Sequence, residues 1–227
     1  MNINRLTLIV LIGFSTIKIF GQTQCEICQD IFKTRDFLKA KNACLKASES
    51  GDPVCQAYLG IIYLSESDMG NAFIWFQKSA SQGNDIGQNG LGYLYQNGYG
   101  GVDRDTSKAN NWFLKSAVQG NSDSQFWLGE NLFLSGNKAE GYKWTLKASL
   151  SGSADAQYNL GAMLYNGEGT EKKDSLAVMW FIISATNGNE KSKSFIDNLK
   201  TTISDDEFQN YLKVTQDFIN KNTQVIK

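Results

Sequence analysis

The chain has 227 residues, 41% of them hydrophobic and 20% charged, and its 22 Lys and Arg nearly balance its 23 Asp and Glu. The resulting net charge of −1 gives no electrostatic attraction to nucleic acid or to an anionic membrane surface. Because the sequence contains no histidine, an imidazole base and a histidine-centred catalytic triad are both excluded.

Residues 1–21 are predicted to be a signal peptide. A short basic start leads into mostly apolar residues from Leu6 to Ile17, and Lys18 ends this run before the ~20 residues of a membrane span. Gly21 suits a cleavage site; an uncleaved anchor is the alternative. We expect a mature chain from Gln22, with 20 basic against 23 acidic residues and a net charge of −3, that is periplasmic or secreted.

The only cysteines lie near the start of the predicted mature chain: Cys25, Cys28, Cys44 and Cys55. An even number of cysteines in an exported protein favours two disulfides, for which three pairings are possible. A turn near residues 33–35 would place Cys28 and Cys44 at similar heights on facing helices, which leaves Cys25 to pair with Cys55. We prefer this nested arrangement of disulfides.

Two other interpretations of these cysteines are a redox CxxC motif, formed by Cys25 and Cys28, and a metal site. Redox motifs of this kind normally belong to a βαβ context, and the sequence shows no strand here. A zinc site is less favoured because there is no histidine and cysteines of exported proteins more often oxidise. No metal and no cofactor is therefore expected.

A period of 32 to 37 residues runs through the centre of the chain. Leu-Gly pairs recur at spacings of 32, 37 and 32: Leu59-Gly60, Leu91-Gly92, Leu128-Gly129 and Leu160-Gly161. A glutamine stands four residues before each of these glycines: Gln56, Gln88, Gln125 and Gln157. Tryptophans recur at spacings of 37, 32 and 36: Trp75, Trp112, Trp144 and Trp180. Two registers with the same period indicate an internal repeat.

Each repeat is predicted to be a helical hairpin that ends in a glycine. Small residues such as Gly60 and Gly161 would let two helices approach closely, while leucine and tryptophan fill the space between hairpins. A single hairpin cannot bury its own apolar face, so several must stack to be stable. The expected fold class is therefore all-α, an α-solenoid of stacked helical hairpins.

The pattern AQYNLG...Y..G.G....D...A..W...A..G, which starts at Ala156, resembles the Sel1-like repeat, a relative of the tetratricopeptide repeat with a slightly longer turn. The resemblance places four repeats at 52–83, 84–120, 121–152 and 153–188. It implies a scaffold that binds a protein or peptide, and we expect no enzymatic activity.

Weaker segments flank the four repeats, and one domain is expected over 22–221. Residues 22–51 form a degenerate, disulfide-stapled N-terminal hairpin, in which Ala43 takes the place of the tryptophan. Residues 189–221 form a C-terminal cap, whose last helix starts with a capping box of Ser204 and Glu207. A short tail, 222–227, follows.

One face of the first helices differs from the predicted core. Residues at this face are spaced i, i+4 and i+7 or i+8, and they combine aromatic with amide and acidic side chains. Such a mixture is typical of a protein-binding groove, although the aromatics could instead pack between hairpins. The predicted partner-binding residues, on the concave side that such helices line in related repeats, are Asn89, Tyr93, Gln96, Phe126, Glu130, Phe133, Tyr158 and Tyr165.

Two further functions remain as alternatives to a general scaffold. One is an inhibitor or immunity-type protein that blocks a single toxic enzyme of the cell envelope, a role known for the resembling family. The other is a hydrolase of cell-wall fragments or β-lactams, for which the string from Ser135 to Lys138 fits S-x-x-K. That string falls in a predicted turn and lacks the companion motifs, so the hydrolase is disfavoured.

Overall fold

The computed structural model describes residues 24–221, in which every regular element is an α-helix and no strand occurs. The predicted signal peptide and the tail 222–227 lie outside the described residues. The chain divides between Asp105 and Thr106 into two compact units, which are described one at a time. The predicted all-α architecture of helical hairpins is confirmed; a single domain over 22–221 stays a prediction.

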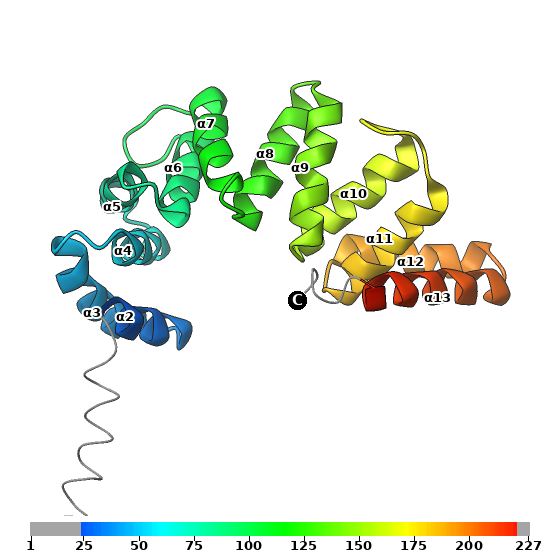
Figure 1. Ribbon diagram of the computed structural model, residues 1–227, viewed down its shortest axis with the longest axis horizontal. Helices are drawn as coiled ribbons and strands as arrows, with labels where there is room; N and C mark the ends of the chain where they lie inside the picture. The colour runs from blue at the N-terminus through cyan, green and yellow to red at the C-terminus, as the bar shows by residue number, and fades with distance from the viewer. Residues whose placement is uncertain (1–23, 222–227) are drawn as a thin grey trace, which may run out of the picture. The chain divides into compact units, whose positions relative to one another are not determined.

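The N-terminal unit, described from residue 24 to residue 105, consists of helices that each pack against the next (Figure 1). Alternate helices also touch, α2 with α4 and α4 with α6, as expected when hairpins stack. The helices of this unit are α2 (Gln24–Lys33), α3 (Phe37–Glu49), α4 (Pro53–Ser65), α5 (Met69–Ser81) and α6 (Asp85–Asn97).

The C-terminal unit, described from residue 106 to residue 221, continues the hairpin pattern and adds a longer last helix that packs on α11. Its helices are α7 (Thr106–Ala117), α8 (Ser122–Leu134), α9 (Lys138–Leu150), α10 (Ala154–Asn166), α11 (Asp174–Thr186), α12 (Glu190–Thr202) and α13 (Asp205–Lys221). Among the described residues, no helix is long and apolar enough to cross a membrane.

The helix ends follow the signals in the sequence. The first helices of the repeats are capped by side chains that accept backbone N–H groups, for example Asp52 from Val54 and Cys55. Glycines with φ between 85° and 100° follow the second helices, at Gly83, Gly120, Gly152 and Gly188. The capping residue predicted for α13 is confirmed, since Ser204 Oγ accepts the N–H of Glu207 at 3.3 Å.

Small residues allow large rings to pack directly on helix backbones. The ring of Phe76 is almost fully buried, and a Cβ added to Gly60 or Gly90 would come within 2.6 or 2.5 Å of it. A Cβ at Gly161 would likewise lie 2.8 Å from the ring of Phe181. At Gly60 and Gly161 the neighbouring helix therefore approaches through a ring and not, as predicted, backbone to backbone. A direct backbone approach occurs at Gly141, where a Cβ would lie 2.9 Å from the carbonyl oxygen of Gly129.

The repeated glutamine has a structural role that its spacing did not reveal. In three repeats its side-chain amide donates to a backbone carbonyl eight residues earlier, near the end of the preceding helix. These bonds run from Gln56 to Ser48 at 3.0 Å, from Gln125 to Ala117 at 3.1 Å and from Gln157 to Ser149 at 3.0 Å. Each joins one hairpin to the next through a buried hydrogen bond, whose loss would cost about 1–3 kcal/mol.

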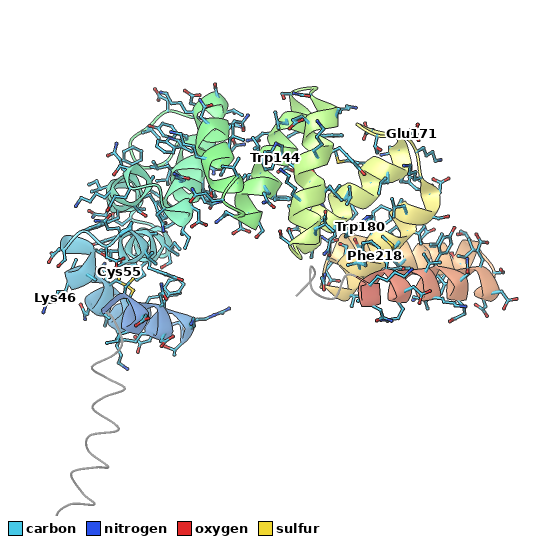
Figure 2. The ribbon with its side chains drawn as sticks, in the orientation of Figure 1. Lys46, Cys55, Trp144, Glu171, Trp180 and Phe218 are labelled. Atoms are coloured by element: carbon cyan, nitrogen blue, oxygen red, sulfur yellow. A yellow bond between two sulfur atoms is a disulfide. The ribbon has the colours of Figure 1, made fainter. Side chains whose placement is uncertain are left out.

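The repeated tryptophans are covered in two ways. In three repeats the ammonium of the lysine three residues later lies over the indole ring. The distances to the ring centroid are 3.9 Å for Lys78 and Trp75, 4.2 Å for Lys115 and Trp112, and 3.9 Å for Lys147 and Trp144. Trp180 instead meets Phe218 of α13 edge to face at 5.5 Å, and both side chains are labelled in Figure 2. The last helix thus shields the final tryptophan with an apolar ring.

The N-terminal hairpin is joined by the predicted disulfide between Cys28 of α2 and Cys44 of α3.

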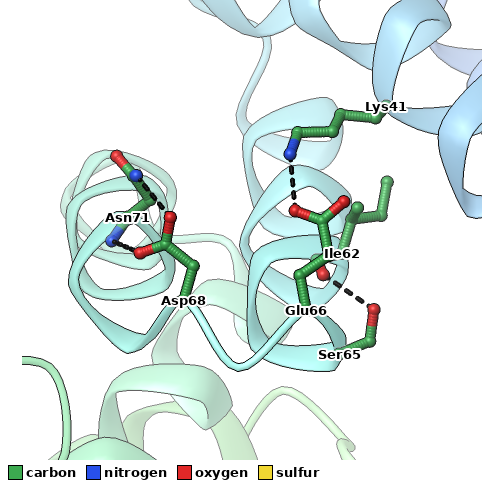
Figure 3. A network of polar contacts seen from close by, with 6 residues as sticks. All are labelled: Lys41, Ile62, Ser65, Glu66, Asp68 and Asn71. Atoms are coloured by element: carbon green, nitrogen blue, oxygen red, sulfur yellow. Dashed lines mark hydrogen bonds and ion pairs between the residues drawn. The ribbon is translucent and has the colours of Figure 1, made fainter.

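Polar contacts hold the short turn between α4 and α5, as Figure 3 shows. Lys41 of α3 pairs with Glu66 in this turn, and Asp68 caps α5 by accepting the backbone and side-chain N–H groups of Asn71.

Candidate functional site

The residues predicted to bind a partner are all at least partly accessible. Seven of the eight are half-buried, and Tyr165 is 44% exposed. Several of the aromatics also pack within the fold: Tyr158 lies 5.7 Å from Phe181, and Tyr165 lies 5.9 Å from Phe195. Groove and packing are therefore not exclusive for these rings, and the concave face as a whole stays a prediction.

Two residues of this set, Glu130 and Phe133, line a cavity of about 190 Å³ in the C-terminal unit. Helices α8 and α10 each contribute residues spaced i, i+3 and i+4, which is one face of a helix. One residue of α9 and one of the turn after α10 complete the walls. The lining consists of Glu130, Phe133, Leu134, Thr145, Asn159, Ala162, Met163 and Glu168.

The cavity exists because two large side chains are missing from the contact between the third and fourth repeats. In every repeat, the residue directly after the tryptophan faces the residue fourteen positions later, which lies on the first helix of the following hairpin. These pairs are Phe76 with Gly90, Phe113 with Trp127, Thr145 with Asn159, and Phe181 with Phe195. The rings of Phe181 and Phe195 lie 4.2 Å apart and fill their site, whereas Thr145 and Asn159 leave theirs open.

A second cause of the cavity's shape is the glycine-rich turn after α10. Gly169 has φ of 75°, and a Cβ there would collide with the carbonyl of Lys138 at the start of α9. This close approach brings the neighbouring Glu168 to the cavity, where its Oε1 accepts a hydrogen bond from Lys138 Nζ at 2.7 Å. The turn therefore supplies a wall of the cavity as well as a chain reversal.

The pKa values of the two carboxyl groups of the cavity are shifted in opposite directions. The hydrogen bond from Lys138 lowers the pKa of Glu168, which stays ionised. Burial raises the pKa of Glu130; the charge of Lys191 opposes this shift, and that of Asp155 adds to it. Within the described residues, the side-chain carboxyl group of Glu130 makes neither a hydrogen bond nor an ion pair. A half-buried carboxyl group without a partner therefore faces an open site.

The sequence contains a signal for this cavity at one position of the repeat. The residue after the tryptophan is phenylalanine in three repeats and threonine in the third, and this difference is visible in the sequence. Leu134, Asn159 and Glu168 were not predicted as site residues. Leu134 lies next to Phe133 and is 74% exposed at the edge of the cavity.

The S-x-x-K string does not assemble a serine–lysine pair. Lys138 is directed to Glu168, and the hydroxyl of Ser135 donates to the carbonyl of Leu132 at 2.9 Å. Both groups serve the turn between α8 and α9 and its contact with the next repeat.

A cluster of possible metal ligands lies in the N-terminal unit. The thiols of Cys25 and Cys55 and a carboxylate oxygen of Asp52 lie within 4.8 Å of one another there. Burial, followed by the contact with Cys55, raises the pKa of the Cys25 thiol far above its ordinary value. Asp52 already caps α4. Protonated thiols and an occupied carboxylate suit a pair of cysteines better than a metal site. The Cys25–Cys55 disulfide stays a prediction, with its two thiols side by side.

Comparison with known proteins agrees with this architecture. A family model described as the Sel1 repeat matches residues 53–84, 86–121, 122–153 and 154–189. No curated protein matches the sequence.

Two crystal structures show the same fold. A Sel1 repeat protein from Oxalobacter formigenes is 27% identical with a TM-score of 0.62, and the match covers 71% of this chain and 49% of that one. A protective antigen present in uropathogenic Escherichia coli strains is 24% identical with a TM-score of 0.54, and the match covers 89% of this chain and 54% of that one. The chain thus spans about half the length of both.

Sel1 repeats form a scaffold that generally serves protein–protein interaction. The matched repeats cover more than half of the sequence, and stacked hairpins form both units. The chain therefore belongs to the Sel1 repeat family.

Proposed function

We propose that this protein is an exported interaction scaffold that binds another protein or peptide on the first helices of its repeats, with its principal contact at α8 and α10. The observation that carries the proposal is the open cavity between these helices, which Glu130, Phe133 and Ala162 share with the exposed Leu134. A concave site with apolar walls and a few polar groups is the usual form of a specific binding site. The repeat family supports a protein rather than a nucleic acid as the partner.

Export is supported by the sequence and by the cysteines. The segment 1–21 has the composition of a signal peptide, and the Cys28–Cys44 disulfide belongs to an oxidising compartment. Cell fractionation, combined with a count of free thiols in the denatured, unreduced protein, tests both points. We expect an extracytoplasmic protein with no free thiol. A cytoplasmic protein with four free thiols would contradict export.

Binding is tested by placing a photo-crosslinking amino acid at position 134, on the rim of the cavity. Leu38 of α3 provides a matched control, because it is 70% exposed against 74% for Leu134 and lies in the other unit. We expect one protein to be crosslinked at position 134, and we expect that protein not to be crosslinked at position 38. That protein is then purified, and its Kd is measured with the wild type and with Leu134→Asp and Leu38→Asp variants.

The affinity separates the candidate functions. Loss of binding in Leu134→Asp with retention in Leu38→Asp would place the contact at the cavity. A single partner bound tightly at one-to-one stoichiometry would identify the inhibitor or immunity-type role, and several weaker partners would identify a general scaffold. Equal affinity in all three proteins would contradict a contact at α8 and α10. For the hydrolase, no geometric observation provides support.

A further inference from the structure

The cavity at α8 and α10 also carries information about the chemistry of its occupant. Its walls combine apolar side chains, Phe133, Leu134 and Met163, with two carboxylates. The one ammonium at its edge belongs to Lys138, which is bonded to Glu168 and lies 5.1 Å from the centroid of the Phe133 ring. A cavity of about 150 Å³ is large enough for a benzene-sized ligand. The 190 Å³ available here therefore fits one long side chain rather than a folded segment.

Charge distinguishes between the side chains that could enter. Glu168 is already neutralised by Lys138, whereas Glu130 has no hydrogen-bond or ion-pair partner among the described residues. Lys191 attracts Glu130 from a distance, but its ammonium lies over the Tyr158 ring, 5.5 Å from the centroid. An anionic occupant would be repelled by the carboxylate of Glu130, which no bonded cation neutralises. An apolar occupant would bury Glu130 completely and leave it unpaired, which is costly.

A cationic side chain with an apolar stem satisfies both the walls and the carboxylate. Neither oxygen of Glu130 is used by the protein, so both can accept from one guanidinium in a two-point contact. The side-chain amide of Asn159 makes no hydrogen bond within the described residues, and its carbonyl oxygen is a further acceptor in the same cavity. An ammonium group, which acts as a point charge, would use these acceptors less completely.

We infer that this cavity binds an arginine side chain of the partner protein, with its stem against Phe133, Leu134 and Met163 and its guanidinium on Glu130. The inference rests on the proposed function, because it assumes that the cavity is the contact site. Arginine is frequently a dominant residue of protein interfaces, which fits a single anchoring side chain.

The test uses a small probe, acetyl-arginine N-methylamide, so that it does not depend on identifying the partner. The chain contains only four methionines, and Met163 lines the cavity. Labelling the methionine methyl groups with ¹³C gives a sparse spectrum in which Met163→Leu assigns the reporter signal. Met179, buried in the core of the C-terminal unit, reports on folding.

We expect the Met163 signal to shift in a saturable manner with the arginine probe, and the Met179 signal to stay in place. The lysine analogue should bind more weakly, and the citrulline analogue, which has the same shape without the charge, should bind at least tenfold more weakly. Glu130→Gln should lose the response to arginine. Glu171→Gln, in the same turn region but outside the cavity lining, is the matched control and should retain it.

Three results would overturn the inference: no shift with the arginine probe, an equal response to citrulline, or an unchanged response in Glu130→Gln. These results are distinguishable from failure of the proposed function. If the crosslinked partner still loses affinity in Leu134→Asp while the arginine probe has no effect, the binding site stands and the arginine assignment falls.

Discussion

Two successive contacts between hairpins lie in the same unit, yet one is open and the other is filled. Where the fourth repeat meets α12, Phe181 and Phe195 pack with Tyr158 and Tyr165 into a continuous set of rings. Where the third repeat meets the fourth, Thr145 and Asn159 stand at the equivalent positions and leave a cavity. A contact between repeats can thus become an open site by losing two core side chains, while the neighbouring contacts maintain the fold.

The largest effect is expected from Phe181→Thr, which empties the filled site. The ring is 3% exposed and packs on Gly161, so its removal leaves a cavity and should lower the free energy of unfolding by about 3–5 kcal/mol. Thermal or urea denaturation measures the loss. Thr145→Ala, at the equivalent position of the open site, should cost clearly less; equal losses would show that the third repeat is packed as tightly as the fourth.

The reverse change, Asn159→Phe, should close the open site, because it supplies the ring that α12 has at the equivalent position, Phe195. We expect at least a tenfold weaker Kd for the partner and for the arginine probe, with a melting temperature close to that of the wild type. Binding titration together with thermal denaturation checks both outcomes. Retained affinity in the folded variant would mean that the cavity is not the contact site.

A smaller effect is expected from the unpaired carboxyl group of the open site. Because the pKa of Glu130 is raised in the folded state, the folded chain holds its proton more tightly than the unfolded chain does. Stability therefore falls as the pH rises from the ordinary glutamate value of 4.5 through the folded pKa.

Replacing this group by the neutral Glu130→Gln should consequently raise the melting temperature at pH 7, by at most about 2–4 °C since the group is half-exposed. The gain should shrink as the pH is lowered from the folded pKa of Glu130 to the ordinary value of 4.5, and it should be absent below 4.5. Melting curves of both proteins between pH 3 and pH 8 test this. A variant that is destabilised at pH 7 would instead indicate that Glu130 has a stabilising partner.

The smallest effect concerns how the two tryptophans are covered. Lys147 lies over Trp144 in the third repeat, and Phe218 covers Trp180 in the fourth. Lys147→Ala should cost about 0.5–1 kcal/mol, the usual strength of an exposed cation–π contact. Denaturant titration is precise enough to detect it, and a loss well above this range would show that the lysine stem also packs on the indole.

The fold was predictable because it depends on features that recur. The Leu-Gly pairs, the tryptophans and the terminal glycines gave the hairpins, and the count of residues around the first turn gave the Cys28–Cys44 disulfide. The role of Gln157 was not predicted, since its spacing alone does not reveal that it bonds the carbonyl of Ser149.

The candidate site was only partly predictable for the opposite reason. Glu130 and Phe133 were identified from the helical face on which they lie, but the cavity depends on Thr145 and Asn159, which depart from the repeat. Its acidic wall depends on Gly169, whose turn carries Glu168 to Lys138, thirty positions earlier in the chain. Periodicity predicts what the repeats share, whereas this site depends on two large side chains that are missing between the third and fourth repeats.

The pKa of the Glu130 side chain, measured by NMR on the ¹³C-labelled carboxyl group with and without acetyl-arginine N-methylamide, tests guanidinium binding in the cavity without a variant protein. We expect a pKa above the ordinary glutamate value in the free protein, which falls when the arginine probe is added and does not change with the citrulline analogue. A Glu130 pKa that is the same with and without the arginine probe would contradict a guanidinium-binding site between the third and fourth repeats.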